Sequence, residues 1–450
     1  MSSMQLLTYK QQVSSLLRLG LPIVVGQLGM IILGLADTIM IGHHSTEELA
    51  AAAFVNNVFN LAIIFATGFS YGLTPLIGML QGGGNTQGIG RVFRNALAAN
   101  ASVAVLLTAV MYTVYCFVDK LGQPEELLPH IRPYFVLQLI SLLFIMLFNG
   151  FRQFAEGLTD TRTPMWILLG GNALNIFGNY LLIYGSFGFP EWGLFGAGVS
   201  TLVSRIVMLL VFIGVVAVAR RYKVYREAIL RSRFNRNDFI QLNALGWPIA
   251  LQMGMETAAF SLSAIMVGWL GSIPLAAHQI MISVSTIGFM VYYGMGAALA
   301  VRVSHFMGQK DFPNLRRAVN SGMGIILSLA IVASLFFYLV RTPIIYSFTE
   351  DHEVMIVVSS LIFSLIVYQF GDALQITFAN ALRGTTDVKP MMWIAFFSYF
   401  IVALPVGYLC GFTWGGGVVG VWVAFPAGLF TAGFLFWLRF RYRLQQLMKK

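Results

Sequence analysis

One uncharged stretch decides the fold class: residues 391–411, MMWIAFFSYFIVALPVGYLCG. About twenty apolar residues, coiled as a helix, match the hydrocarbon thickness of a bilayer. A second run of this kind extends from Val103 to Val118 with its flanks, and we count twelve along the 450 residues. Only 10% of the residues are charged and 58% are hydrophobic, whereas soluble proteins average about 25% charged residues. The sequence therefore predicts an all-α membrane protein with twelve transmembrane helices.

The first apolar run begins near Val13 and continues past Asp37 without an A-x-A-like cleavage site. It is therefore expected to be a membrane span and not a signal peptide. The predicted spans are 15–41, 50–79, 95–118, 131–153, 164–188, 193–219, 241–270, 275–302, 318–341, 354–380, 390–411 and 415–438.

The net charge of +10 raises the question of a nucleic-acid partner, but the placement of the basic residues answers it. Lys and Arg gather at the two ends of the chain and in every second loop, with the densest stretch between Arg220 and Arg236. The intervening loops carry acids instead. This is the charge pattern that sets membrane orientation, so both termini are expected in the cytoplasm and no nucleic-acid partner is expected. The basic residues outside the pattern are Lys120, Arg132, Arg205 and Arg341.

The chain is an internal duplication. A shift of 226 positions aligns the motif L-G-x-P-I at Leu19 with the same motif at Leu245, and the match continues through several glycines. Each half holds six spans, an even number, so the repeats are parallel and related by an axis along the membrane normal. We expect two parallel six-helix repeats around a central cleft: an N-terminal lobe over 1–219, a basic cytoplasmic linker over 220–240 and a C-terminal lobe over 241–450.

Three acidic residues lie well inside apolar runs: Asp37, Glu256 and Asp372. Acids at bilayer depth are costly and are typical of ion or substrate pathways. Arg205 is the only base predicted well inside a span, so it can pair with one of them at most. None of the three recurs at the matching position of the other repeat, which favours a functional role.

Oxygen-bearing side chains accompany the acids at helical spacing. Asn172, Asn175 and Asn179 form one stripe, and Tyr368 lies one turn before Asp372. Such oxygens suit a hard cation such as Na⁺, and buried acids can carry protons instead. The residues alone do not choose between these two ions.

These segments resemble the multidrug and toxic compound extrusion (MATE) family, specifically its NorM-type branch. The resemblance covers nearly the whole chain. It rests on the L-G-x-P-I opening of each half and on the segments GLADTIMIG at 34–42, QMGME at 252–256, AAHQI at 276–280, GD at 371–372 and GLTDTRTP at 157–164.

The resemblance implies export of small organic cations in exchange for a monovalent coupling cation, Na⁺ or H⁺, by alternating access. It implies no enzymatic activity, no cofactor besides the coupling ion, a monomer, and a bacterial cytoplasmic (inner) membrane location. It also implies that Pro22 bends the first helix. The cation or substrate residues it implies, with Na⁺ at either acid group, are Asp37, Asn175, Asn179 and Thr201 in the N-terminal lobe, and Glu256, Asp372, Tyr368 and Gln279 in the C-terminal lobe.

Three alternatives stay open at this point. The first is a passive channel, although the duplicated lobes favour alternating access. A lipid-linked oligosaccharide flippase would share the general architecture but would need a cationic cleft, for which Arg205 is the only candidate residue. An intramembrane enzyme would need a catalytic pattern, and neither His278 nor His305 lies in a G-x-S-x-G or H-E-x-x-H motif.

Overall fold

The computed structural model describes residues 6–348 and 350–449, and these residues form helices and no strands. Twelve helical segments are long and apolar enough to cross a membrane, as predicted. Most helices extend beyond the predicted spans, by up to ten residues where the twelfth was expected to end at 438 and ends at Met448, whereas the fifth run was extended too far, to residue 188. That helix ends at Ile183, and Gly185 just beyond it has a φ of 65°, a conformation that favours glycine and stops a helix.

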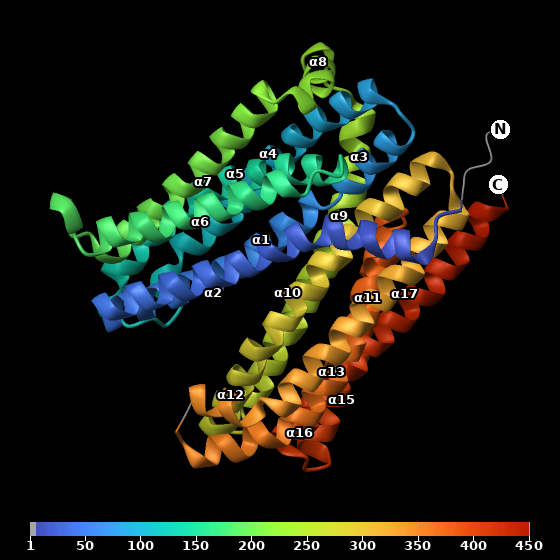
Figure 1. The fold of residues 1–450 in the computed structure, drawn as a ribbon. Coiled ribbons are helices and arrows are strands. Elements are labelled where there is room, and N and C mark those ends of the chain that lie inside the picture. Colours follow the sequence, from blue (N-terminus) through green and yellow to red (C-terminus); the bar gives the residue numbers. More distant parts are fainter. Residues whose placement is uncertain (1–5, 349, 450) are drawn as a thin grey trace. The chain divides into compact units, whose positions relative to one another are not determined.

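The helices divide by their contacts into two units, residues 25–250 and residues 1–24 with 251–450. Figure 1 shows their order along the chain. The first nine are α1 (Tyr9–His44), α2 (Thr46–Ser70), α3 (Leu73–Gly82), α4 (Thr86–Cys116), α5 (Leu128–Gly157), α6 (Arg162–Ile183), α7 (Gly193–Val218), α8 (Lys223–Arg231) and α9 (Arg236–Gly268). The rest are α10 (Ser272–Gln309), α11 (Phe312–Leu339), α12 (Arg341–Phe348), α13 (His352–Gly384), α14 (Lys389–Phe396), η5 (Phe397–Ala403), α15 (Leu404–Tyr408), η6 (Leu409–Thr413), α16 (Gly417–Trp422) and α17 (Ala424–Met448).

Each unit is built around one central helix. In residues 25–250 this is α5, which packs against α2, α4 and α7, and the bundle of α4 to α7 is visible in Figure 1. Its core includes the edge-on pair of Phe59 and Phe135, whose ring centroids lie 4.7 Å apart. In the other unit α13 is central and packs against α10, α11 and α17. The core there includes Trp422 and Phe425, whose ring centroids lie 5.1 Å apart.

The duplication is visible in local structure. Asn85 accepts a hydrogen bond from the Gly88 amide at 2.8 Å and begins α4. Asp311 lies 226 positions later and accepts one from the Asn314 amide at 3.1 Å to begin α11. Both side chains satisfy an amide that has no partner within its helix. Equivalent positions therefore perform the same capping role in both repeats.

The boundaries of the two units fall inside helices. The first unit begins after Val24 in α1 and ends at Ala250 in α9, which are 226 positions apart, and each lies two residues after a proline, Pro22 or Pro248. The units therefore differ from the lobes predicted from the repeats, because the first part of α1 and of α9 makes its contacts with helices of the other repeat. The lobe boundaries at 219 and 241 describe the repeats and stay a prediction.

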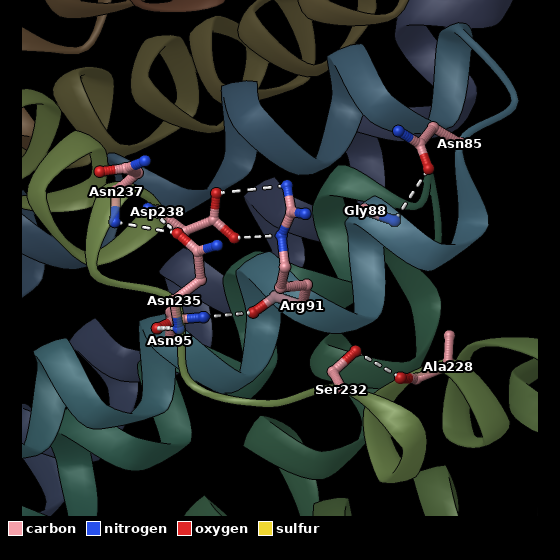
Figure 2. Close-up of polar contacts among 9 residues, drawn as sticks. All are labelled: Asn85, Gly88, Arg91, Asn95, Ala228, Ser232, Asn235, Asn237 and Asp238. Atoms are coloured by element: carbon pink, nitrogen blue, oxygen red, sulfur yellow. Dashed lines mark hydrogen bonds and ion pairs between the residues drawn. The ribbon is translucent and has the colours of Figure 1, made fainter.

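Hydrogen bonds hold the beginning of α9 against α4, as Figure 2 shows. Arg91 Nε donates to Asp238 Oδ2 at 2.6 Å, and the backbone amide of Asn235 donates to Asn95 Oδ1 at 3.0 Å. The short helix α8 approaches α4 closely at Gly90, where an added Cβ would lie 2.5 Å from the backbone carbon of Ala228. The absence of a side chain at Gly90 is thus a requirement of this packing.

We predict that Gly90→Ala lowers the free energy of unfolding by about 1–3 kcal/mol, because overpacking against backbone forces α8 to move. Thermal unfolding of the purified protein measures this. Gly214→Ala is the matched control, since the space around Gly214 in α7 is open and alanine favours a helix by about 0.5–1 kcal/mol. Equal stability of the two variants would contradict the packing argument.

Candidate functional site

A cavity of about 130 Å³ lies within residues 25–250, among α1, α2, α5, α6 and α7. The predicted residues Asp37, Asn175 and Thr201 line it, and so does Arg205. The lining therefore contains one acidic side chain, Asp37, and one basic side chain, Arg205. The full lining is Leu33, Asp37, Asn56, Tyr134, Gln138, Gly171, Asn172, Asn175, Thr201, Ser204, Arg205 and Met208.

The Asp37 carboxylate is held by amides. Asn179 Nδ2 donates to Asp37 Oδ1 at 2.6 Å. The side-chain amide of Asn175 lies 2.9 Å from the same oxygen. When the amide nitrogen faces Asp37, it donates to Asp37 Oδ1, and the amide oxygen accepts from the Thr201 hydroxyl at 3.1 Å. The structure thus brings together all four residues predicted for the N-terminal lobe, Asp37, Asn175, Asn179 and Thr201. Their functional role stays a prediction.

Arg205 is held by neutral groups. Its Nη1 donates to Gln138 Oε1 at 3.1 Å and to the Ser141 hydroxyl. Among the described residues it forms no ion pair. Arg205 and Asp37 therefore line the same cavity without forming an ion pair with each other.

Two polar atoms of buried residues that line this cavity have no hydrogen-bond partner among the described residues: Asn172 Nδ2 and Ser204 Oγ. Buried polar groups are normally paired with protein or water. The cavity is therefore suited to water or to a polar group of a ligand. Asn172 belongs to the predicted asparagine stripe, whereas nothing in the sequence pointed to Ser204.

Glu256 lies in the other unit, on α9, in a network of amides. Gln252 Nε2 and Gln375 Nε2 each donate to Glu256 Oε2 at 3.0 Å. Arg383 Nη2 in turn donates to Gln252 Oε1 at 2.8 Å. Gln252 therefore links the Arg383 guanidinium to the Glu256 carboxylate by two hydrogen bonds. Sequence reasoning missed Gln375 and Arg383. Arg383 lies one residue from the end of α13, where the charge pattern assigned it to a loop, yet its side chain is buried.

Asp372 is the most buried of the three acids, with 1% of its surface exposed. Neither carboxylate oxygen has a hydrogen-bond partner among the described residues. Tyr368, one turn earlier on α13, is also buried and packs edge-on against Phe260 and Phe425. The structure places Asp372 and Tyr368 together inside the unit, as predicted from their spacing.

Gln279 and Pro22 are not part of either group. The Gln279 side chain is exposed on α10, and its neighbour His278 is buried and accepts a hydrogen bond from Trp422 Nε1 at 3.1 Å. Pro22 lies inside α1, two residues before the change of unit after Val24. The roles implied for both residues stay predictions.

The ligand atoms around Asp37, Glu256 and Asp372 indicate which kind of ion each place suits. No three His, Cys, Asp or Glu side chains of the described chain lie close enough together to hold a metal ion. Single carboxylates beside amide and hydroxyl oxygens offer one negative charge each. Hard oxygen ligands with a single charge fit a monovalent cation or a proton better than a divalent ion.

Comparisons with known proteins agree with this architecture. The family model MatE matches twice, over residues 22–181 and 248–409, so the second match begins 226 positions after the first and each begins at one of the duplicated prolines. "Multidrug resistance protein NorM" of Photobacterium profundum is 30% identical over 448 residues, which is 96% of each chain.

Two solved structures share the fold at low identity. An outward-facing multidrug resistance MATE family transporter of the MOP superfamily superposes with a TM-score of 0.88 at 21% identity, over 98% of this chain and 97% of the other. A mutant of the Vibrio cholerae MATE transporter VcmN gives 0.88 at 18% identity, over 98% and 99%. These matches, with the two copies of the family model and the NorM relative, show that the chain belongs to the MatE family and has the twelve-helix fold of MATE transporters.

Proposed function

We propose that the protein exports organic cations across the membrane in exchange for Na⁺ or H⁺, by alternating access. The relative from Photobacterium profundum is named as a multidrug resistance protein, which supports the substrate class. The placement of the acids supports the exchange. The protein would act as a transporter and not as an enzyme.

One observation carries the proposal: three carboxylates lie within membrane spans, and none takes part in an ion pair among the described residues. Each costs about 2.5–3.5 kcal/mol at bilayer depth. Amides hold Asp37 and Glu256 but supply no full positive charge. A mobile cation would relieve this cost.

Exchange follows if the coupling cation and the organic cation compete for the same carboxylates, directly or through helix rearrangement. A ligand shifts a conformational equilibrium only by its differential affinity for the two states. Binding of one cation therefore favours release of the other, and the two are not carried together.

Membrane potential limits the stoichiometry. A potential of 100 mV contributes about 2.3 kcal/mol per net charge moved. One ion exchanged for one monovalent drug moves no net charge, so the potential helps only if more than one ion enters. We infer that either more than one ion is exchanged per drug molecule, or export depends on the chemical gradient of the ion alone.

The relative from Photobacterium profundum supports a bacterial inner-membrane location. The basic residues gather in every second loop, which supports a cytoplasmic position for both termini. The lipid bilayer, small organic cations and the coupling ion are the expected partners, and we expect a monomer.

Efflux of a fluorescent organic cation from preloaded right-side-out vesicles tests the function. We expect efflux only when an inward Na⁺ gradient or an inward pH gradient is imposed, and the two gradients are applied separately to identify the ion. Vesicles without the protein are the control. Efflux that needs neither gradient would contradict exchange.

We predict that Asp37→Asn, Glu256→Gln and Asp372→Asn each reduce efflux at least tenfold while membrane expression stays near normal, because the variants keep shape but lose charge. Glu126→Gln is the control and should transport normally, because Glu126 is exposed in the short 3-10 helix Glu125–Leu127 before α5. Full transport by all three variants would show that these acids are not the site.

Arg205 generates a further prediction. Unit charges within about 10 Å interact by about 1–2 kcal/mol at an effective dielectric constant of 20. We therefore expect Arg205→Gln to lower the coupling-ion concentration for half-maximal efflux roughly tenfold, since Asp37 then loses the competing charge. Arg341→Gln removes an exposed base and serves as the control. An unchanged half-saturation would mean that Arg205 does not act on the ion site.

A further inference from the structure

A histidine at the end of α1 lies between two carboxylates. His44 Nδ1 lies 2.8 Å from Glu48 Oε2 in the first turn of α2, and His44 Nε2 lies 2.9 Å from Glu191 Oε1 in the connection from α6 to α7. Both are hydrogen-bond distances. All three residues belong to the unit of residues 25–250, so one imidazole joins three segments of this unit.

This histidine completes a line of contacts along α1. Asp37 Oδ1 accepts from Asn179 Nδ2 at 2.6 Å, and the Met40 carbonyl accepts from the Tyr184 hydroxyl at 2.7 Å. Residues 37, 40 and 44 are one helical turn apart and therefore share a face of the helix. His44 makes the last of three contacts through which α6 and the segment after it hold this half of α1, the half that presents Asp37 to the cavity.

The number of hydrogens on His44 depends on pH. An ionised carboxylate only accepts hydrogen bonds, and a neutral imidazole carries a single N–H. A neutral His44 therefore donates to Glu48 or to Glu191, but not to both. A protonated His44 has two N–H groups and donates to both carboxylates, and such charge-assisted hydrogen bonds are the stronger kind. Because both ring nitrogens face carboxylate oxygens, the arrangement fits the protonated ring.

Glu48 is held more firmly than Glu191. It is 8% exposed, and its Oε2 also accepts from the Leu194 backbone amide at 2.9 Å, at the beginning of α7. A Cβ added at Gly193 would overlap both carboxylate oxygens of Glu48, so the missing side chain makes room for them. The Glu191 side chain is 65% exposed, so water can replace His44 as its partner. We therefore expect a neutral His44 to keep Glu48 and to release Glu191.

Other charged side chains at this end of the unit do not take the place of His44. His130, near the beginning of α5, lies 3.7 Å from Glu48 Oε1, which is too far for a hydrogen bond. The remaining charged side chains of these segments and the loops beside them, none of which forms an ion pair with His44, Glu48 or Glu191 in the described chain, are His43, Glu47, Asp119, Lys120, Glu125, Glu126 and Arg132.

We propose that His44 is a proton-binding site that controls a tether, the hydrogen bond from its Nε2 to Glu191, between α1 and the α6–α7 connection. Histidine changes its charge between about pH 5 and 8. The tether is closed while His44 is protonated and opens as rising pH removes the second N–H. Its opening removes one of the three contacts that hold the half of α1 bearing Asp37.

The charge pattern of the loops predicts that this end of the unit lies on the outer side of the membrane. The tether then responds to the pH outside the cell. The proposal goes beyond cation export and does not depend on it, because it concerns a contact that the protein makes whether or not a substrate is present.

Hydrogen–deuterium exchange of the purified full chain tests the tether at about pH 5.5 and about pH 8.5, near the two ends of the histidine range. The measurement is the protection of the amides of residues 184–194, relative to the same peptides unfolded at the same pH. In the wild type this protection should be roughly tenfold higher at the lower pH, the effect of one hydrogen bond to a charged group.

Two variants hold the tether in its two states. Glu191→Gln places an amide opposite His44 Nε2, and an amide both donates and accepts. The amide therefore pairs with the ring in either charge state, and protection should stay high at both pH values. His44→Phe keeps a ring but removes both nitrogens, so protection at the lower pH should fall to the level that the wild type shows at the higher pH.

Glu47→Gln is the matched control for Glu191→Gln, because Glu47 is an exposed acid in the same turn of α2 as Glu48. It should keep the pH dependence of the wild type, and so should His130→Gln. A wild type with equal protection at the two pH values would overturn the proposal. A pH dependence that persists in His44→Phe, or that disappears in His130→Gln, would also overturn it, because another group would then control this segment.

Discussion

The interior of a membrane contains no water to pair with a polar group or to screen a charge. Every backbone amide and carbonyl in a span must therefore find its partner within a helix, and the described chain meets this requirement with helices alone. Side chains carry the remaining polarity. The same lack of water that imposes helices also makes each of the three acids costly.

The two units meet this cost in different ways. In residues 25–250 Asp37 accepts from amides of α6 and shares its cavity with Arg205, whose charge is held at a distance by Gln138 and Ser141. In the other unit Glu256 accepts from two glutamines while Asp372 has no partner among the described residues. The unit of residues 25–250 thus contains a positive charge near its acid, whereas the other unit contains a carboxylate without a hydrogen-bond partner among the described residues.

The repeats share their framework but not their chemistry. The capping residues Asn85 and Asp311 and the prolines Pro22 and Pro248 occur at matching positions, and the family model begins at both prolines. The acids do not recur in this way. Residues that shape the helices recur in both halves, because both halves face the same membrane. If the acids bind a ligand, as we propose, they need not recur, because a site requires each group only once.

The sequence by itself determined the number of spans, the duplication and the identity of the acids, because bilayer thickness and helical spacing act on local residues. Helical periodicity also predicted that Asn175 and Asn179 share a face and that Tyr368 lies beside Asp372. Only the tertiary structure decided which distant side chains complete each group, such as Gln375 at Glu256 and Arg383 behind Gln252. These contacts join different helices, and nothing in the spacing along one helix specifies which face of another helix it meets.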